Sequence, residues 1–308
     1  MFASEPHDEP DVKSDSQVPR TTGAAPSHEA PQWSDSRTEI HASEKQLIAD
    51  YFAEHEFLLP SVVFELPSAS DENRRNPSAS IIVNAGTQPN QVVNSTLAWV
   101  EKNPKLGPFF LTWYTPGHLI PETLRKFRTA RGNLHMAAAV RLFLFPGEVD
   151  FETQSVCGPD AEAFANNLQR RFTYAFLSAY AFDIHTGDVY FHGARELALQ
   201  QKVAMRFAAT KFLFLDSSKF KPEGDGERGY TVHELLETSH TVTIYTDSVG
   251  EKHDRWVMDG FDKLGSSLFR EHAEAQGNKK RLCLRIVDRT GKLTNADSTV
   301  HEGYLHRM

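Results

Sequence analysis

One repeated unit constrains the fold of this chain more than any other feature. In this unit a short run of β-branched or aromatic residues is followed by a turn, and a proline then stands where a helix would begin. Three copies occur, in which residues 81–83 lead to Pro89, residues 109–112 to Pro121 and residues 140–145 to Pro159. Proline suits the first helical position because the amide there has no partner within the helix. Strands that alternate with helices predict an α/β fold with a mainly parallel sheet and helices on both faces.

Further apolar runs extend the predicted sheet over residues 174–180, 211–215, 241–246 and 281–287. The run 211–215 follows an apolar-faced helix and leads directly into Asp216-Ser217-Ser218-Lys219-Phe220. In open α/β sheets, ligands bind beyond the carboxyl ends of the strands. A lysine, two hydroxyls and a carboxylate at such a position predict a site for a phosphorylated, polyhydroxylated molecule.

The remaining segments carry weaker patterns. Residues 1–42 are rich in proline, serine and charge with almost no large apolar side chains, which predicts a disordered tail. Ser43 and Gln46 fit a capping box at the start of a helix over residues 43–57. We expect a short edge strand over residues 58–65, a polar loop over residues 68–80, an amphipathic helix over residues 256–269 and a loose polar end over the last sixteen residues.

Composition limits the function classes. The chain has 308 residues, of which 40% are hydrophobic, so it can bury a substantial core. The net charge of -8 disfavours attraction to a polyanion, and we expect no direct DNA binding from this chain alone. No apolar run approaches the ~20 residues of a membrane helix, and none marks a secretory signal. Two distant cysteines fit a cytoplasmic protein. The histidines lack the spacing of a zinc site, so neither a metal nor a cofactor is expected.

Five motifs occur in an order that resembles one known family: Ala85-Gly86-Thr87, Pro146-Gly147-Glu148, residues 158–162, Asp216 to Phe220, and Tyr245-Thr246-Asp247. They resemble the sensor domain of DeoR-type sugar-metabolism repressors, which has the fold of ribose-5-phosphate isomerase and the CoA transferases. The resemblance covers residues 43–250, and we expect residues 251–308 to complete the same domain. It implies an effector-binding module for a small phosphorylated sugar or related metabolite that signals to a partner. The family's N-terminal helix-turn-helix has no counterpart in residues 1–42, so we expect the sensor half without the DNA-reading half.

The predicted ligand-binding residues follow from the motifs and the resemblance together. They are Gly86, Thr87, Gln88, Thr112, Asp183, Asp216, Ser217, Ser218 and Lys219. The Gly86-Thr87 turn would bring the amides at the start of the next helix to a phosphate. The family usually has Gly-Thr-Thr there, so Gln88 removes one hydroxyl. Thr112 is aligned with the family's threonine after the second strand, and the bulky Trp113, Tyr180 and Phe182 would narrow or fill the pocket.

Alternatives remain open at this point. The chain could be an isomerase-like enzyme in which Asp183 or Glu196 acts as the base and Lys219 stabilises the anion, or a degenerate scaffold with a blocked pocket. Locally, Lys219 could be a solvated turn lysine, and Asp183 could cap a turn with Gly187. Sensor domains of the resembled family associate, and the helix over residues 43–57 has many large apolar side chains, so we expect a homo-oligomer, most simply a two-fold dimer.

Overall fold

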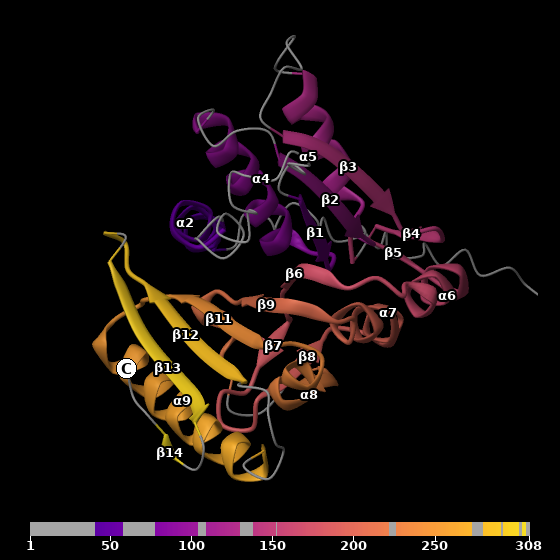
Figure 1. Ribbon diagram of the computed structural model, residues 1–308. Coiled ribbons are helices and arrows are strands. Elements are labelled where there is room, and N and C mark those ends of the chain that lie inside the picture. Colours follow the sequence, from indigo (N-terminus) through magenta and orange to yellow (C-terminus); the bar gives the residue numbers. More distant parts are fainter. Residues whose placement is uncertain are drawn as a thin grey trace, which may run out of the picture. The chain divides into compact units, whose positions relative to one another are not determined.

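Strands and helices alternate along the chain, as the repeated unit predicts (Figure 1). The computed structural model describes residues 41–57, 78–103, 109–129, 138–151, 153–221, 226–272, 280–290, 292–301 and 304–305. The expected tail, apart from its last two residues, and the expected edge strand over residues 58–65 lie outside the described residues. So does most of the expected polar loop over residues 68–80, whose last three residues already belong to the first strand.

The large sheet has the strand order β14-β13-β12-β11-β9-β6-β1-β2-β3. Its strands are β1 (Ser78–Val83), β2 (Phe109–Thr115), β3 (Ala138–Leu144), β6 (Phe172–Leu177), β9 (Ala208–Phe214), β11 (Thr241–Asp247), β12 (Arg281–Val287), β13 (Leu293–His301) and β14 (Tyr304–Leu305). All neighbours from β12 to β3 run parallel, whereas β13 is antiparallel to β12. The predicted α/β fold with a mainly parallel sheet is therefore confirmed.

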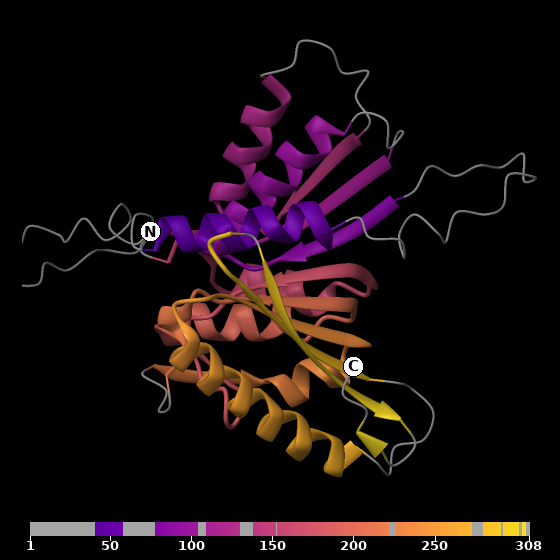
Figure 2. The same ribbon diagram turned by 90° about the vertical axis from the view of Figure 1, so that its left-hand side faces the viewer.

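Helices cover both faces of this sheet (Figures 1 and 2). They are α2 (Ala42–His55), α4 (Thr87–Lys102), α5 (Leu119–Thr129), α6 (Pro159–Asn167), α7 (Ala194–Ala204), α8 (Val232–Glu237) and α9 (Glu251–His272). Ile81 of β1 packs in one core with residues of α2, α4 and α5, while Ile82 packs in the other core with residues of α6 to α9. Successive residues of a strand point to opposite faces, which explains the apolar runs of this sheet. Within the described ranges, no helix is both long and apolar enough to cross a membrane.

Two small sheets flank the large one. The strands β4 (Glu148–Asp150) and β5 (Ser155–Cys157) form an antiparallel hairpin. The strands β7 (Ala181–Phe182), β8 (Asp188–Phe191) and β10 (Glu227–Thr231) form a three-stranded antiparallel sheet. Phe182 of β7 also bridges to Phe220, so this second sheet adjoins the segment that follows β9.

Helix starts differ from the sequence expectation in detail. The predicted capping box at Ser43 is wrong, because α2 begins after His41 and the Ser43 hydroxyl donates to the adjacent Glu44. Pro159 opens α6 as predicted, whereas Pro89 and Pro121 are the third residues of α4 and α5. The first turn of a helix has amides without intrahelical partners, so proline is tolerated throughout it and does not mark the first residue.

The end of the chain also differs from expectation. The last sixteen residues were expected to be loose, yet Leu293–His301 form β13, which pairs with the whole length of β12. Without this strand, the outer N–H and C=O groups of β12 would lack ladder partners. On its other side, within the described ranges, β13 pairs only with the two-residue strand β14, and a strand this near the sheet edge needs no apolar run, so its polar sequence gave no strand signal.

The large side chains of α2 belong to this chain's own core. Ile48, Ala49 and Phe52 are fully buried, and the Phe52 ring meets the rings of Phe212 and Phe214 at centroid distances of 4.8 and 5.0 Å. The apolar face of this helix therefore offers no surface for association. The expected homo-oligomer remains a prediction, and it requires another surface.

Candidate functional site

Four adjacent parallel strands end at the same edge of the sheet. They are β11, β9, β6 and β1, and their carboxyl ends lead to Asp247, to residues 216–219, to Ser178 and to the Gly86-Thr87 turn respectively. The reciprocal bonds Asn84 Nδ2 to Ser178 O (3.1 Å) and Ser178 N to Asn84 Oδ1 (3.2 Å) join the ends of β1 and β6. The structure thus brings together most of the residues that the sequence predicts for a ligand site.

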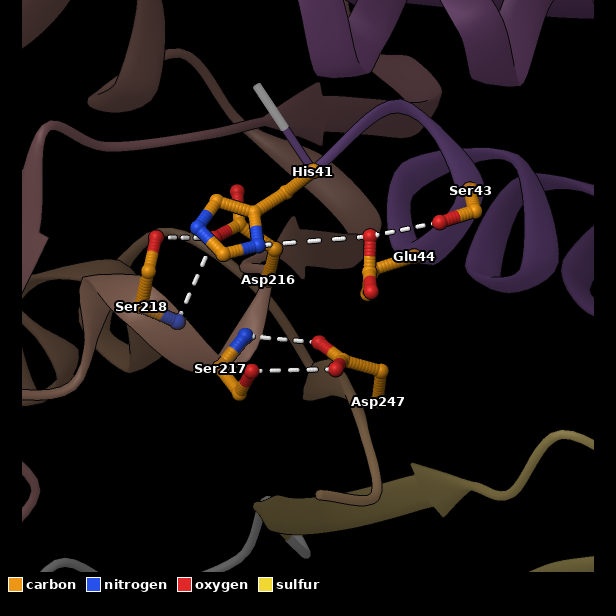
Figure 3. Close-up of polar contacts among 7 residues, drawn as sticks. All are labelled: His41, Ser43, Glu44, Asp216, Ser217, Ser218 and Asp247. Carbon is orange, nitrogen blue, oxygen red and sulfur yellow. Dashed lines mark hydrogen bonds and ion pairs between the residues drawn. The ribbon is translucent and has the colours of Figure 1, made fainter. Parts of the chain in front are cut away.

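The carboxylates and hydroxyls after β9 and β11 are hydrogen-bonded to one another (Figure 3). Asp216 caps the short 3-10 helix Ser217–Lys219 and accepts from the backbone N–H and the hydroxyl of Ser218. Ser217 donates from its backbone and its hydroxyl to Asp247. Both carboxyl residues are 1% exposed. Burial raises the pKa of Asp247, and the hydrogen bonds from Ser217 oppose this rise.

Lys219 lies beside an aromatic ring. Its ammonium is 5.6 Å from the centroid of Tyr180, and the Lys221 ammonium is 5.0 Å from the same centroid. Both contacts are within the range of cation–π attraction. The two lysines therefore share one environment, and a substitution of Lys221 would also change the surroundings of Lys219.

Lys45 is a second lysine of this site, and the sequence reasoning did not assign it to the ligand. It lies in the first turn of α2 and is only 5% exposed. Burial and the charge of Lys219 lower the pKa of Lys45, whereas the charge of Asp216 raises it. The Lys45 side chain therefore interacts electrostatically with two residues of the segment that follows β9. The sequence does indicate that Lys45 is buried, because Lys45, Ile48, Ala49 and Phe52 follow the i, i+3, i+4, i+7 spacing of one helix face. A lysine on a buried helix face usually interacts with other charged or polar groups.

The Gly86-Thr87 turn stands at the start of α4. Gly86 is the N-cap with φ 131°, a conformation that favours glycine, and an added Cβ would lie 3.3 Å from Ser178 Oγ. Both residues of the turn are partly exposed. Gln88 is buried instead, and its Nε2 donates to the backbone oxygen of Lys45 at 3.1 Å. Gln88 therefore joins α4 to α2 and does not present its amide to the site edge.

Asp183 holds its own turn. Its Oδ1 accepts from the backbone N–H of His185 at 2.8 Å, and its backbone oxygen accepts from Gly187 at 2.8 Å. Asp183 thus closes a turn with Gly187 through its backbone and with His185 through its carboxylate, and its role toward a ligand stays a prediction. The preceding Phe182 accepts from the backbone N–H of Lys221 at 3.0 Å, so Asp183 follows a segment that contacts the residues after β9.

Two predicted residues are not placed with this group. Thr112 lies in the middle of β2, where it pairs with Ser80 and Arg141, and the strand continues to Thr115. The Thr115 hydroxyl accepts from the N–H of Gly117 at 2.9 Å, which makes Thr115 the threonine at the strand end. Glu196 lies in the first turn of α7, and its side chain is outside the described part of the structure.

The bulky residues expected to narrow the pocket have different roles. Trp113 and Phe182 are fully buried in the two cores on opposite faces of the sheet. Tyr180 is the one that contacts the lysines after β9. Of the three, only Tyr180 therefore contributes a ring to the surroundings of Lys219.

Two comparisons with known proteins found no match to this chain. They are a scan against models of protein families and a search of curated proteins. Within the described ranges, no cluster of three or more His, Cys, Asp or Glu side chains could hold a metal ion.

Proposed function

We propose that this protein is an effector-binding module of the kind that DeoR-type regulators carry, and that it binds a small phosphorylated sugar or related metabolite at the carboxyl ends of β1 and β9. One observation carries the proposal. Lys45 of α2 and Lys219 after β9 both act at the end of β9: burial lowers the pKa of Lys45, Asp216 raises it and Lys219 lowers it, while Gln88 ties the backbone of Lys45 to the start of α4. An anion between two such groups would offset both their repulsion and the burial of Lys45.

The start of α4 supplies the second part of an anion site. The Gly86 N-cap has no side-chain oxygen that could satisfy the first amides of the helix, and no acidic residue stands in its first turn. The partial positive charge of the helix start thus remains available to a phosphate. Gln88 links this turn to the backbone of Lys45, which keeps the helix start and the buried lysine in a fixed relation.

Hydroxyl groups at the same edge suit the sugar part of such a ligand. Ser218 is exposed, and Thr87 is partly exposed. Asp216 and Asp247 order the loop between them through Ser217 and Ser218. A loop ordered before binding loses less conformational entropy when the ligand arrives.

The position of Lys45 suggests how binding is communicated. Lys45 belongs to α2, which directly follows the N-terminal residues in the sequence and packs on the sheet through Phe52. An anion that interacts with Lys45 would act on this helix directly. We propose that a partner reads the state of α2.

Calorimetric titration tests the proposal with matched pairs: ribose 5-phosphate against ribose, and glucose 6-phosphate against glucose. We expect at least one phosphorylated sugar to bind more than about tenfold tighter than its parent, because a charge-assisted bond contributes roughly 1.5 to 3 kcal/mol. At a hundred times its dissociation constant, that sugar should stabilise the protein by about 2.7 kcal/mol in a thermal-shift screen. Equal affinities within every pair would contradict a phosphate site.

The enzyme alternative needs its own assay. Asp183, its proposed base, is 5% exposed, and its carboxylate is engaged in its own turn. We therefore expect no isomerisation of ribose 5-phosphate by the purified protein. Sustained turnover that is lost in Asp183→Asn would overturn the assignment as a binding module.

A further inference from the structure

A hollow lies at the surface where β11 leads into α9. Its volume is about 540 Å³, which is within the range of pockets that hold small molecules. The segment that lines it begins two residues after Asp247, the last residue of β11. The lining residues are Val249, Gly250, Glu251, Lys252, His253 and Trp256. The hollow therefore adjoins the edge of the sheet at which the candidate site lies.

Trp256 is the largest side chain of this hollow, and neighbouring rings hold it in position. It is partly exposed, and its ring centroid lies 5.8 Å from that of His253 and 5.7 Å from that of His185. Val249, which is 56% exposed, adds an apolar side chain to the rim. An aromatic ring that is held in place before binding loses little conformational entropy when a planar group packs against it.

The start of α9 is not suited to an anion. Glu251 and Asp254 stand in its first turn and already complement the positive end of the helix dipole. The hydroxyl of Ser248 also donates to the Asp254 carboxylate. The start of α4 differs, because its first turn contains no acidic residue. The hollow at α9 therefore suits the uncharged part of a ligand, whereas the start of α4 suits its phosphate.

Ring contacts and hydrogen bonds join the hollow to the segment that carries Lys219. Phe220 follows Lys219 directly, and its ring centroid is 6.2 Å from that of His253. The two bonds from Ser217 to Asp247 tie the same segment to the end of β11 (Figure 3). Since β9 and β11 are adjacent strands, their ends are only about 4.8 Å apart. One small molecule can thus extend from Lys219 to the hollow.

We propose that the hollow binds a planar heteroaromatic ring, so that the phosphorylated metabolite is a nucleotide. Its base packs on Trp256, and its phosphate meets Lys219 and the start of α4, with the ribose between them. The phosphate half of this inference rests on the proposed function, whereas the ring half rests on the hollow and its tryptophan. Stacking of a base on an aromatic side chain corresponds to roughly fivefold to 150-fold in affinity.

Calorimetric titration of the full chain with four probes tests the two halves separately. The probes are adenosine 5′-monophosphate, adenosine, ribose 5-phosphate and ribose. We expect adenosine 5′-monophosphate to bind at least about fivefold tighter than ribose 5-phosphate. Trp256→Ala should lower the affinity for both adenosine compounds by at least about fivefold and leave that for ribose 5-phosphate unchanged. Trp99→Ala, which removes a partly exposed tryptophan of α4, is the matched control and should change neither.

A second variant covers the case in which Trp256→Ala does not fold, because Trp256 also packs on the core. Trp256→Phe keeps a ring at this position and thus most of the packing. Adenosine should quench the tryptophan fluorescence of the wild type, and this quenching should be absent in Trp256→Phe. Quenching that persists unchanged in Trp256→Phe would overturn the ring site.

The remaining outcomes distinguish the ring site from the phosphate site. Equal affinities for adenosine and ribose would overturn the ring site, as would equal effects of Trp256→Ala and Trp99→Ala on adenosine binding. Equal affinities for adenosine and adenosine 5′-monophosphate, both reduced in Trp256→Ala, would support the ring site and overturn the phosphate site of the proposed function.

Discussion

Ser217 donates both its backbone N–H and its hydroxyl to the carboxylate of Asp247, at 2.6 and 2.9 Å. The two residues stand at the carboxyl ends of the adjacent parallel strands β9 and β11. This double contact fixes the loop after β9 to the neighbouring strand. The serine that the sequence assigns to ligand binding is therefore part of the frame that holds Lys219 in place.

Removing this carboxylate should destabilise the fold. Asp247→Ala leaves the N–H and the hydroxyl of Ser217 without their shared acceptor, and we expect the free energy of unfolding to fall by about 2 kcal/mol or more. Ser217→Ala keeps the backbone bond and should cost about 1 kcal/mol. Urea denaturation of both variants measures the difference. A larger loss for Ser217→Ala than for Asp247→Ala would contradict this account.

Lys219→Ala should weaken binding of a phosphorylated sugar without weakening the fold. Loss of a charge-assisted hydrogen bond predicts a tenfold to hundredfold lower affinity, at about 1.4 kcal/mol per factor of ten. Lys221→Ala would be an unsuitable control, because both lysines contact Tyr180. Lys102→Ala is the better control, since this exposed lysine ends the helix that Thr87 begins. Equal calorimetric losses in the two variants would leave Lys219 as a turn residue.

Lys45→Met separates ligand binding from stability in the same site. Methionine keeps most of the side-chain volume and removes a charge whose burial is unfavourable, so we expect the free energy of unfolding to change by no more than about 1 kcal/mol. Affinity for the phosphorylated sugar should fall at least about tenfold. Titration and urea denaturation of one protein preparation give both values. Unchanged affinity would remove Lys45 from the site.

Lys211 predicts a pH dependence of stability. It is fully buried in β9, its ammonium donates to Ala204 O at 2.6 Å and to the Thr238 hydroxyl, and burial together with Lys280 lowers its pKa from 10.5 to about 7. Between these two values the unfolded chain binds more protons than the folded one. The free energy of unfolding should therefore rise as the pH rises from about 7, by at most about 1.4 kcal/mol per pH unit, and the gain is lost as the pH falls back to 7.

Comparison with Lys211→Met isolates this contribution from the other titrating groups. The difference in unfolding free energy between the wild type and this variant should change with pH over the alkaline range. For Lys263→Met, at an exposed position of α9, the corresponding difference should stay constant. Parallel stability curves for the wild type and Lys211→Met would show that the lysine is charged throughout.

The sheet was predictable where both of its faces are buried. The runs that became β1, β9, β11 and β12 are apolar because each strand contacts helices on two sides. The end of β2 could not be located in the same way, because the run from Phe109 to Thr115 has no break. Thr112 was therefore predicted to end the strand, although the strand continues for three more residues. The polar sequence of β13 gave no signal, because a strand next to the sheet edge is not covered on both faces as the central strands are.

The site was predictable as far as local motifs reach. Strand-to-helix turns place Gly86, Thr87 and residues 216–219 at one edge of any parallel sheet. Motifs do not show which polar groups form hydrogen bonds with one another. Only the structure shows that Ser217 bonds to Asp247 and that the buried Gln88 side chain bonds to the backbone of Lys45. The spacing of Lys45 marks it as a buried-face residue, but which charged groups it meets, Asp216 and Lys219, depends on how α2 packs on the sheet.

The packing of Phe52 determines where a stable fragment of this protein can begin. Its ring contacts aromatic rings from β6, β9 and β11, namely Phe176, Phe212, Phe214 and Tyr245. A fragment that begins at β1 would expose these rings to water and would be prone to aggregate, since each ring buries on the order of 150 to 250 Å². Expression fragments, protein fusions and protease-resistant cores should therefore all include α2 and begin at or before His41.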